Sequence, residues 1–426
     1  MQATETKSNL YKDLEHNYRV VLWEGSTYSV MAGLTAPFLG VLALKMGATP
    51  FHLSLITALP NLINVLFMVP LAGYLERQNR KLGYCVKGIF GNRIGYFFLG
   101  LLAFLGLSPN LFLLVLAVMT IPGVLAGLSY TDLVAVSFPA RERGKVFGNK
   151  NALVGLLTFS ATMAAGYLLD SVSYPNNYFF VFSVATFFGL INTYTMSRFK
   201  EPYQEKSISR EVREPYWQRL KKILAHEELG QEYKRFLTTI ALVYIGFHIP
   251  AALWTIFYVE EMQMSQFQIG NLTAINNAII VLFSFYWGKK IQRSGDKAVF
   301  AVSLFGVSLV ALWAALAQSV LSLYLLQILG GFSMAAFNIT FFNILIASSE
   351  EKYRPTAVAT FHALIGITGV IFPAIGVWLF RFLTARQVFL LSSSIRLIAA
   401  LVALSSCSKE EMANLFRRKG YFHGNF

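Results

Sequence analysis

Ionisable side chains inside long apolar runs are the residues of this sequence whose type and position could support chemistry. Glu24 lies about 7 Å into the first apolar run if each residue adds about 1.5 Å along a helix. A carboxylate at that depth has two interpretations. It is either an interfacial acid paired with a nearby base such as Arg19, or a buried group that gains and releases a proton.

Basic and amide side chains in other apolar runs raise the same question. Lys87 can reach back to the membrane surface, whereas Arg93 lies deeper and needs a partner or water. Asn61 and Asn64 are close enough in sequence to share one face of a helix. Such amides either bond neighbouring helices together or line a polar cavity.

The elements that carry these residues are predicted to be membrane-spanning helices. Of the 426 residues, 55% are hydrophobic and only 14% are charged, which is too apolar for an ordinary soluble domain. A helix that crosses the membrane needs roughly 20 apolar residues, so the chain has room for about twelve such helices. The strands of a membrane barrel would instead appear as short segments of alternating polar and apolar residues. We predict an all-α polytopic membrane protein with spans at 19–44, 51–74, 84–107, 109–135, 147–170, 176–197, 236–260, 267–288, 298–317, 320–347, 356–380 and 385–406.

Two short hydrophilic segments, residues 73–81 and 288–297, each separate two of these runs and predict antiparallel helical hairpins. Further similarity holds at one offset of 211 residues, which sets Asp132 against Asn343 and Ala152 against Ala363. We therefore expect a duplicated unit. The predicted domains are a six-helix bundle at 1–198, a cytoplasmic linker with an amphipathic helix at 199–235, and a second bundle with a short basic tail at 236–426.

The net charge of +14 is distributed in a way that indicates topology. Nearly all Lys and Arg residues lie on the side of the amino terminus. The exceptions are Lys45, Arg381 and Arg386 on the other side, and Lys87, Arg93 and Arg396 within spans. This asymmetry follows the positive-inside rule and predicts two cytoplasmic termini, while leaving no basic folded domain for nucleic acid. The polar residues 1–18 also do not resemble a secretory signal peptide.

Metal and catalytic motifs are not apparent. Cys85 and Cys407 indicate neither a disulfide framework nor a metal site, and the six histidines are scattered singly. A membrane enzyme would need clustered carboxylates, histidines or a nucleophile beside a base, and the sequence shows no such constellation. We therefore predict no enzyme activity, no catalytic residue, no metal and no cofactor.

The segment at 73–81 resembles the loop between the second and third helices of the major facilitator superfamily, a family of secondary transporters. Its pattern is Gly, a few residues, and Asp-Arg-x-Gly followed by two basic residues, and here Gly73 is followed by Glu76-Arg77-Gln78-Asn79-Arg80-Lys81. Asn79 suits the glycine position because it tolerates the left-handed conformation. Gly73 is one residue too close to the acid. The second segment keeps Gly288, Arg293, Gly295 and Lys297 but has Gln292 where the acid belongs.

The resemblance implies two pseudo-symmetric six-helix bundles around a central cavity, working by alternating access. It also implies a conformational latch, in which Glu76 meets the start of the eleventh helix near Pro355 and Arg77 pairs with Asp132. Gly73, Gly288, Arg293 and Gly295 would complete this latch. The alternative is that such charges, Arg80 and Lys81 above all, only set topology.

The implied cavity is lined mainly by helices 1, 2, 4, 5, 7, 8, 10 and 11. Glu24 is the candidate for ion coupling. The substrate-cavity candidates, each of which could equally serve in packing or in bonding between helices, are Asn61, Asn64, Tyr130, Lys150, Asn151, His248, Trp254, Asn276, Asn277, Asn338 and His362.

The string from Leu22 to Tyr28 resembles the acidic first helix of multidrug/proton antiporters in this superfamily, although their second acid is Ala32 here and residues 161–167 lack their Gly-Pro signature. We expect a monomeric, proton-coupled carrier of a small organic solute in a bacterial inner membrane. Export of an amphipathic or drug-like compound is preferred, with uptake of a sugar or other neutral solute as the competitor. A membrane enzyme or a transporter-like receptor are the alternatives of other classes.

Overall fold

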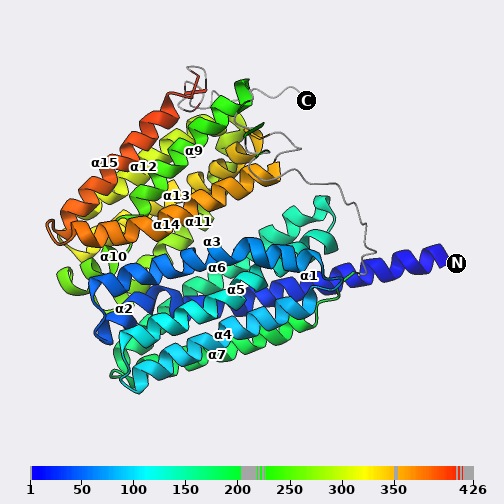
Figure 1. Cartoon of the computed structure of the whole chain (residues 1–426), viewed down its shortest axis with the longest axis horizontal. Coiled ribbons are helices and arrows are strands. Elements are labelled where there is room, and N and C mark those ends of the chain that lie inside the picture. The colour runs from blue at the N-terminus through cyan, green and yellow to red at the C-terminus, as the bar shows by residue number, and fades with distance from the viewer. Residues whose placement is uncertain are drawn as a thin grey trace, which may run out of the picture. The chain divides into compact units, whose positions relative to one another are not determined.

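The chain folds almost entirely into helices in its computed structural model (Figure 1). The structure describes residues 2–202, 218, 221–222, 225, 227–349, 354–408, 411–412 and 415. The amphipathic helix predicted within 199–235 and most of the basic tail fall largely outside these residues. Everything between them is long helices joined by short connections, so the all-α prediction is confirmed.

Each predicted span corresponds to one helix or to short helices in series. The first six are α1 (Gln2–Thr35) with η1 (Ala36–Phe38) and α2 (Leu39–Lys45), then α3 (Pro50–Glu76), α4 (Leu82–Phe104), α5 (Pro109–Ser137), α6 (Ala140–Ser171) and α7 (Asn176–Ser197). The other six are α9 (Glu227–His248) with α10 (Leu253–Ile256) and η2 (Phe257–Glu261), then α11 (Gln266–Ser294), α12 (Asp296–Leu316), α13 (Val320–Ala347), α14 (Arg354–Leu379) and α15 (Ala385–Leu404).

Among the described residues, 11 helices are long and apolar enough to cross a membrane by length and composition alone. The helix that falls short is α4, because Lys87, Asn92 and Arg93 lower its hydropathy. Its 23 residues still match the thickness of a bilayer, and it packs against α5 and α7, which both qualify as spans. Of its polar residues, Asn92 donates to α5 and Arg93 lies against α7, whereas Lys87 is exposed.

Contacts between the helices divide the chain into two compact units. Unit 1 comprises Met1–Glu211, Ile249–Ala278 and Gly369–Phe382, and unit 2 comprises Val212–His248, Ile279–Thr368 and Leu383–Phe426. The helices α11 and α14 each contribute residues to both units.

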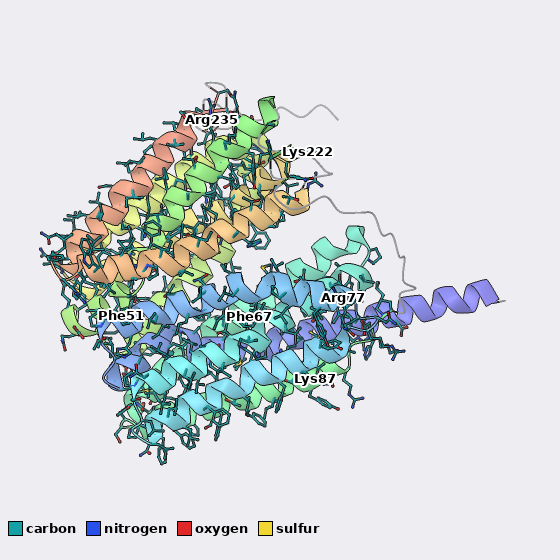
Figure 2. The ribbon with its side chains drawn as sticks, in the orientation of Figure 1. Phe51, Phe67, Arg77, Lys87, Lys222 and Arg235 are labelled. Atoms are coloured by element: carbon teal, nitrogen blue, oxygen red, sulfur yellow. The ribbon has the colours of Figure 1, made fainter. Side chains whose placement is uncertain are left out.

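Unit 1 is built on close pairs of helices, with α1 against α6 and α7, α4 against α5 and α7, and α3 against α5. Glycine permits the approach of α4 to α5, since a methyl group at Gly88 would lie 2.7 Å from the backbone oxygen of Pro122. Figure 2 shows Phe51 and Arg77 at opposite ends of α3. The end that carries Arg77 and Lys81 is called the basic end of unit 1 below.

Unit 2 has an aromatic core. Its helix α12 packs against α13 and α15, and α9 packs against α15. The rings of Phe341 and Phe361 stack with centroids 5.4 Å apart, and Phe236 stacks on Phe361 at 6.1 Å. Since ring pairs of this kind add to the energy of burial, this core is the rigid part of unit 2.

Candidate functional site

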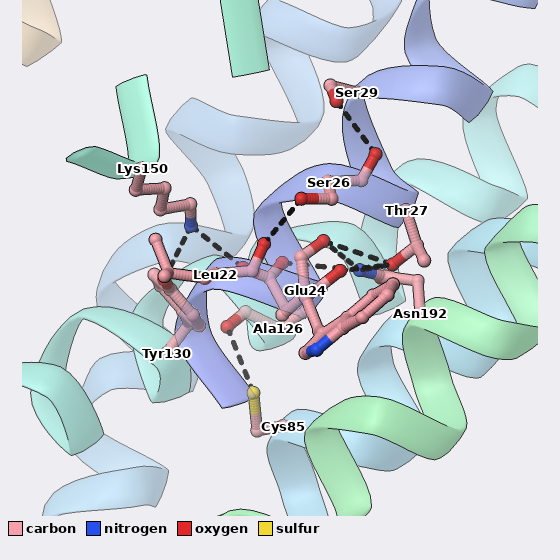
Figure 3. A network of polar contacts seen from close by, with 11 residues as sticks. Leu22, Glu24, Ser26, Thr27, Ser29, Cys85, Ala126, Tyr130, Lys150 and Asn192 are labelled. Carbon is pink, nitrogen blue, oxygen red and sulfur yellow. Dashed lines mark hydrogen bonds and ion pairs between the residues drawn. The ribbon is translucent and has the colours of Figure 1, made fainter. Parts of the chain in front are cut away.

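A pair of opposite charges lies inside unit 1, where α1 meets α6 (Figure 3). The Lys150 ammonium donates to Oε2 of Glu24 over 2.7 Å and to the Tyr130 hydroxyl on α5 over 2.6 Å. The side chains of Lys150 and Glu24 are only 14% and 8% exposed. Either charge buried alone would cost several kcal/mol, so each is tolerated here because the other is present.

Gly25 makes room for Lys150 on the surface of α1. A methyl group at Gly25 would lie 2.6 Å from Cε of Lys150 and 2.9 Å from its Cγ. The aliphatic stem of the lysine therefore crosses α1 at the glycine, which brings its ammonium to the neighbouring carboxylate. The same ammonium lies 4.5 Å from the centroid of the Tyr130 ring, a distance at which cation–π attraction adds to the pairing.

Asn192 holds Glu24 from a third helix, α7. Its amide nitrogen donates to the backbone oxygen of Glu24 over 2.7 Å and lies 3.4 Å from Oε1 of the carboxylate. Asn192 is fully buried, so this contact is shielded from water. The sequence analysis missed Asn192, although an amide within the aromatic-rich sixth span was a signal that could have found it.

Arg93 lies in the same bundle without a carboxylate partner in the described part of the chain. Its guanidinium donates to the side-chain oxygen of Asn92 and lies 4.8 Å from the centroid of the Tyr28 ring, and its Nε is buried with no partner. Tyr28 is one turn along α1 from Glu24. The predicted need of Arg93 for a partner is therefore met by an amide and an aromatic ring, which leave its charge in place.

The surface pairing considered for Glu24 does not occur. Arg19 pairs with Glu15 at 2.6 Å, and both side chains are largely exposed. Glu24 itself is buried and paired with a base 126 residues away. If Lys150 were drawn away, the Glu24 carboxylate would be left buried without a bonded cation.

At the basic end of unit 1, the partner of Asp132 is Lys81 in place of the predicted Arg77. The carboxylate of Glu201 accepts the backbone N–H groups of Lys81 and Leu82, over 2.6 and 3.2 Å, and so fixes the start of α4. This places the Lys81 side chain beside α5, whereas Arg77 ends α3 with an exposed side chain. The side chain of Glu76 and its expected contact near Pro355 lie outside the described residues.

The related segment of unit 2 is organised around the start of α12. Gly295, with φ of +79°, directly precedes α12, and the Asn343 amide donates to Asp296 over 2.8 Å. Asp132 and Asn343, which the predicted duplication sets against each other, thus each bind a residue at the start of the third helix of their own six-helix half. Arg293 is exposed, and open space surrounds Gly288, as it does Gly73.

The opposite end of unit 1 contains a contact that the sequence analysis did not predict. The two carboxylate oxygens of Asp170, at the end of α6, accept the backbone N–H groups of Gln266 and Phe267, over 2.9 and 2.8 Å. A methyl group at Gly166 would lie only 2.8 Å from Cα of Phe267. A carboxylate at the amino end of a helix is stabilised by the unpaired N–H groups and the helix dipole, so Asp170 ties α6 to α11.

The remaining cavity candidates do not gather at the charged pair. In unit 1 the amides of Asn61 and Asn64 donate to backbone oxygens one turn earlier in α3. The other cavity candidates of unit 1 are the exposed Asn151, Trp254 beside Phe257, and the half-buried Asn276 and Asn277. In unit 2 they are His248 beside Tyr244 and the exposed Asn338 and His362. The structure therefore brings together three predicted residues, Glu24, Tyr130 and Lys150.

Among the described residues, no group of three or more His, Cys, Asp or Glu side chains could hold a metal ion. The chemistry that the described side chains offer at the charged pair is proton and ion exchange.

Comparisons with known proteins agree with this architecture. The model of the Major Facilitator Superfamily matches residues 25–247 and 236–414, which together cover most of the chain. No curated protein matches the sequence.

Solved transporter structures share the fold at low identity. A POT family transporter in complex with a thioalcohol conjugated peptide has a TM-score of 0.71 and 12% identity over 92% of this chain and 96% of that one. The nucleoside transporter NupG gives 0.68 and 14% over 94% and 99%, and the human organic anion transporter MFSD10 (TETRAN) gives 0.64 and 14% over 92% and 99%. The chain therefore belongs to the Major Facilitator Superfamily, as an integral multi-pass membrane protein that is a transporter and not an enzyme.

Proposed function

We propose that this protein is a proton-coupled secondary transporter of a small organic solute and that Glu24 carries the coupled proton. The observation that supports this is the buried Glu24–Lys150 ion pair, which lies where three helices of unit 1 meet. A buried ion pair adds little stability compared with apolar residues of the same size, so its presence calls for a functional reason. Exchange of a proton at Glu24 supplies one.

Alternating access requires a closure at each end of the transport path in turn. We assign one closure to the contact of Asp170 with the start of α11, and the other to the Lys81–Asp132 pair at the basic end. Both are made by charges that lose their partners when the helices separate. They bias an equilibrium between two states and take no part in any covalent chemistry.

The geometry at Glu24 bears on the substrate. Export of an amphipathic or drug-like compound is what the Leu22–Tyr28 string favoured, and if that compound were a cation its export would use a carboxylate that is free to bind it. Here Lys150 already neutralises Glu24. Uptake of a neutral solute such as a sugar stays the second candidate, because the aromatic and amide residues of unit 1 could bind it without disturbing the pair.

The surroundings of the protein follow from its charge. The excess of Lys and Arg on the side of the amino terminus supports cytoplasmic termini. We propose a bacterial inner membrane as the location. We propose that a single chain is the transporting unit, since two six-helix halves suffice for alternating access.

The test is solute-driven proton movement in proteoliposomes that contain a pH-sensitive dye. The panel comprises sugars, nucleosides, dipeptides, organic acids and amphipathic cations. We expect at least one compound to move protons in the wild type, and Glu24→Gln to abolish this movement. Glu15→Gln is the matched control, because Glu15 lies on the same helix but is exposed and paired with Arg19. Proton movement that survives in Glu24→Gln would remove Glu24 from the coupling mechanism.

A further inference from the structure

The Lys150 ammonium has a hydrogen-bond donor to spare. An ammonium carries three N–H donors, and two of them serve Glu24 and Tyr130. The third has no partner among the side chains and backbone atoms that the structure describes. Lys150 is also the more exposed member of the pair, and Asn149 and Asn151 beside it on α6 are exposed. The Lys150 side chain therefore keeps a small exposed area, 14%, through which a solute could reach it.

The interior charges of the first six helices do not cancel. Glu24 and Lys150 neutralise each other, whereas Arg93 has only an amide and a ring as partners in the described residues. The other titratable groups that Figure 3 places near Glu24 are Tyr130 and Cys85, a phenol and a thiol, which carry no charge at neutral pH at their ordinary pKa values. This leaves one positive charge inside the bundle, at Arg93, whose guanidinium lies 4.8 Å from the centroid of the Tyr28 ring. In surroundings of low dielectric such a charge attracts anions over several ångströms.

From the spare donor and this excess charge we infer that the substrate is an organic anion whose acidic group binds Lys150, and that one proton enters Glu24 for each anion bound. This inference rests on the proposed function and names its substrate class. An anion of the carboxylate type accepts the third N–H and then competes with Glu24 for the ammonium. The solute that fits is a monoanion with an apolar or amide-bearing body.

The proton count follows from charge balance at the site. Before binding, the Lys150 charge is balanced by Glu24. After binding, it is balanced by the substrate anion, so the buried Glu24 carboxylate is left without a hydrogen-bonded cation, since Arg93 donates to Asn92 instead. Taking one proton from water converts Glu24 to the neutral acid and restores the original sum of charges. Anion and proton therefore enter the site together and leave it together, which is symport.

Cationic and neutral solutes fit the same geometry less well. Oε2 of Glu24 is bonded to Lys150, Oε1 lies beside the Asn192 amide, and the side chain is only 8% exposed. A cation would meet the Lys150 ammonium before it met this carboxylate. A neutral solute would leave the ion pair intact and give Glu24 no reason to change its protonation.

The experiment uses matched solutes that differ in one charged group. Wild-type proteoliposomes with an internal pH dye and a clamped membrane potential receive N-acetylphenylalanine or its neutral amide, gluconate or sorbitol, and benzoate or benzamide. We expect at least one anion to drive acidification of the lumen at least tenfold faster than its neutral counterpart does. Lys150→Gln should lose this movement, and Lys150→Arg should retain part of it.

Two further variants separate function from folding. Glu24→Gln with Lys150→Gln removes both charges together, so it should keep the thermal unfolding temperature of the wild type and still fail to move the anion. Lys87→Gln removes an exposed lysine of the same bundle and should transport as the wild type does.

The outcomes separate this inference from the proposed function. If a neutral or cationic compound drives Glu24-dependent proton movement while none of the three anions does, the proposed function stands and the anion inference is wrong. The inference is also wrong if Lys150→Gln moves the anion as the wild type does. An anion that moves without any proton would overturn both.

Discussion

The two units hold a buried cation in different ways. In unit 1 the Lys150 ammonium is balanced by the Glu24 carboxylate. In unit 2 the fully enclosed Arg396 on α15 donates to the backbone oxygens of Gly246 and Val307, over 2.9 and 3.3 Å, and lies 4.5 Å from the centroid of the Phe247 ring. No carboxylate is bonded to Arg396 within the described residues of unit 2.

The difference lies in what the partners can do. A carboxylate can take up a proton and release its cation, whereas backbone oxygens and an aromatic ring do not titrate. The Arg396 side chain is also packed tightly against Gly246, because a methyl group there would lie 2.6 Å from Cγ of Arg396. The cation of unit 2 is therefore a structural anchor between α9, α12 and α15, while the mechanism that we propose requires the cation of unit 1 to be exchangeable.

The largest effect that would test this contrast is on stability, in Arg396→Leu. Two backbone oxygens would each lose one donor, at a cost of about 2 kcal/mol, or about thirtyfold in the folding equilibrium. Thermal unfolding in detergent should show this loss, while proton movement per folded molecule should stay within about twofold of the wild type. Normal stability combined with lost proton movement would place Arg396 in the transport mechanism.

Gly25→Ala should weaken the exchangeable pair without touching either charge. The new methyl group would push the Lys150 stem away from α1, and we expect about a tenfold loss of proton movement, equivalent to about 1.4 kcal/mol. Gly127→Ala is the control on α5, because nothing lies within 4 Å of a methyl group there. Equal transport by both variants would show that the lysine position is not restricted by α1.

Much of the fold could be predicted from the sequence, because membrane helices follow from hydropathy and length. The exception illustrates the limit. The helix α4 is too polar to meet a hydropathy criterion on its own, and it was predicted from its length and from the hydrophilic segment that precedes it. Two of its polar residues are accommodated by packing and not by local sequence, because Asn92 donates to α5 and Arg93 lies against α7.

The residues of the site could be predicted from the sequence, but the contacts between them could not. Glu24, Tyr130 and Lys150 stood out as polar groups in apolar runs, but the Glu24–Lys150 bond joins residues 126 positions apart. The choice of Lys81 over Arg77 as the partner of Asp132 depends on Glu201, which lies 120 positions from Lys81. Local spacing carries no information about such distant contacts.

Asp170→Ala should have a smaller effect, on the conformational equilibrium. Loss of a carboxylate from two backbone N–H groups at a helix start costs about 1 kcal/mol, or about a fivefold shift toward the state open at that end. The measurement is the labelling rate of Thr162→Cys, a buried position next to Gly270, by a membrane-impermeant maleimide in a chain without Cys85 and Cys407. An unchanged rate would mean that Asp170 is not part of a closure.

The smallest effect on function is expected at Cys407, beyond the end of α15. Burial, with a contribution from Glu411, raises the pKa of this thiol to about 11, so the reactive thiolate is scarce at neutral pH. Alkylation should be slow at pH 7, rise steeply as the pH approaches 11, and leave transport unchanged. Since Cys85 is fully buried, mass spectrometry can assign the label to Cys407. Rapid alkylation at pH 7 would show an open environment at this end of unit 2.

The bonds of Asp170 have a consequence for the time course of transport. One carboxylate holds two N–H groups that are consecutive along the backbone of α11, so any displacement that stretches one bond stretches the other. If this contact is the closure that we propose, it would therefore open in a single step, with no intermediate stabilised by one remaining bond. Recordings of single molecules should show two dwell states at this end, with abrupt transitions between them.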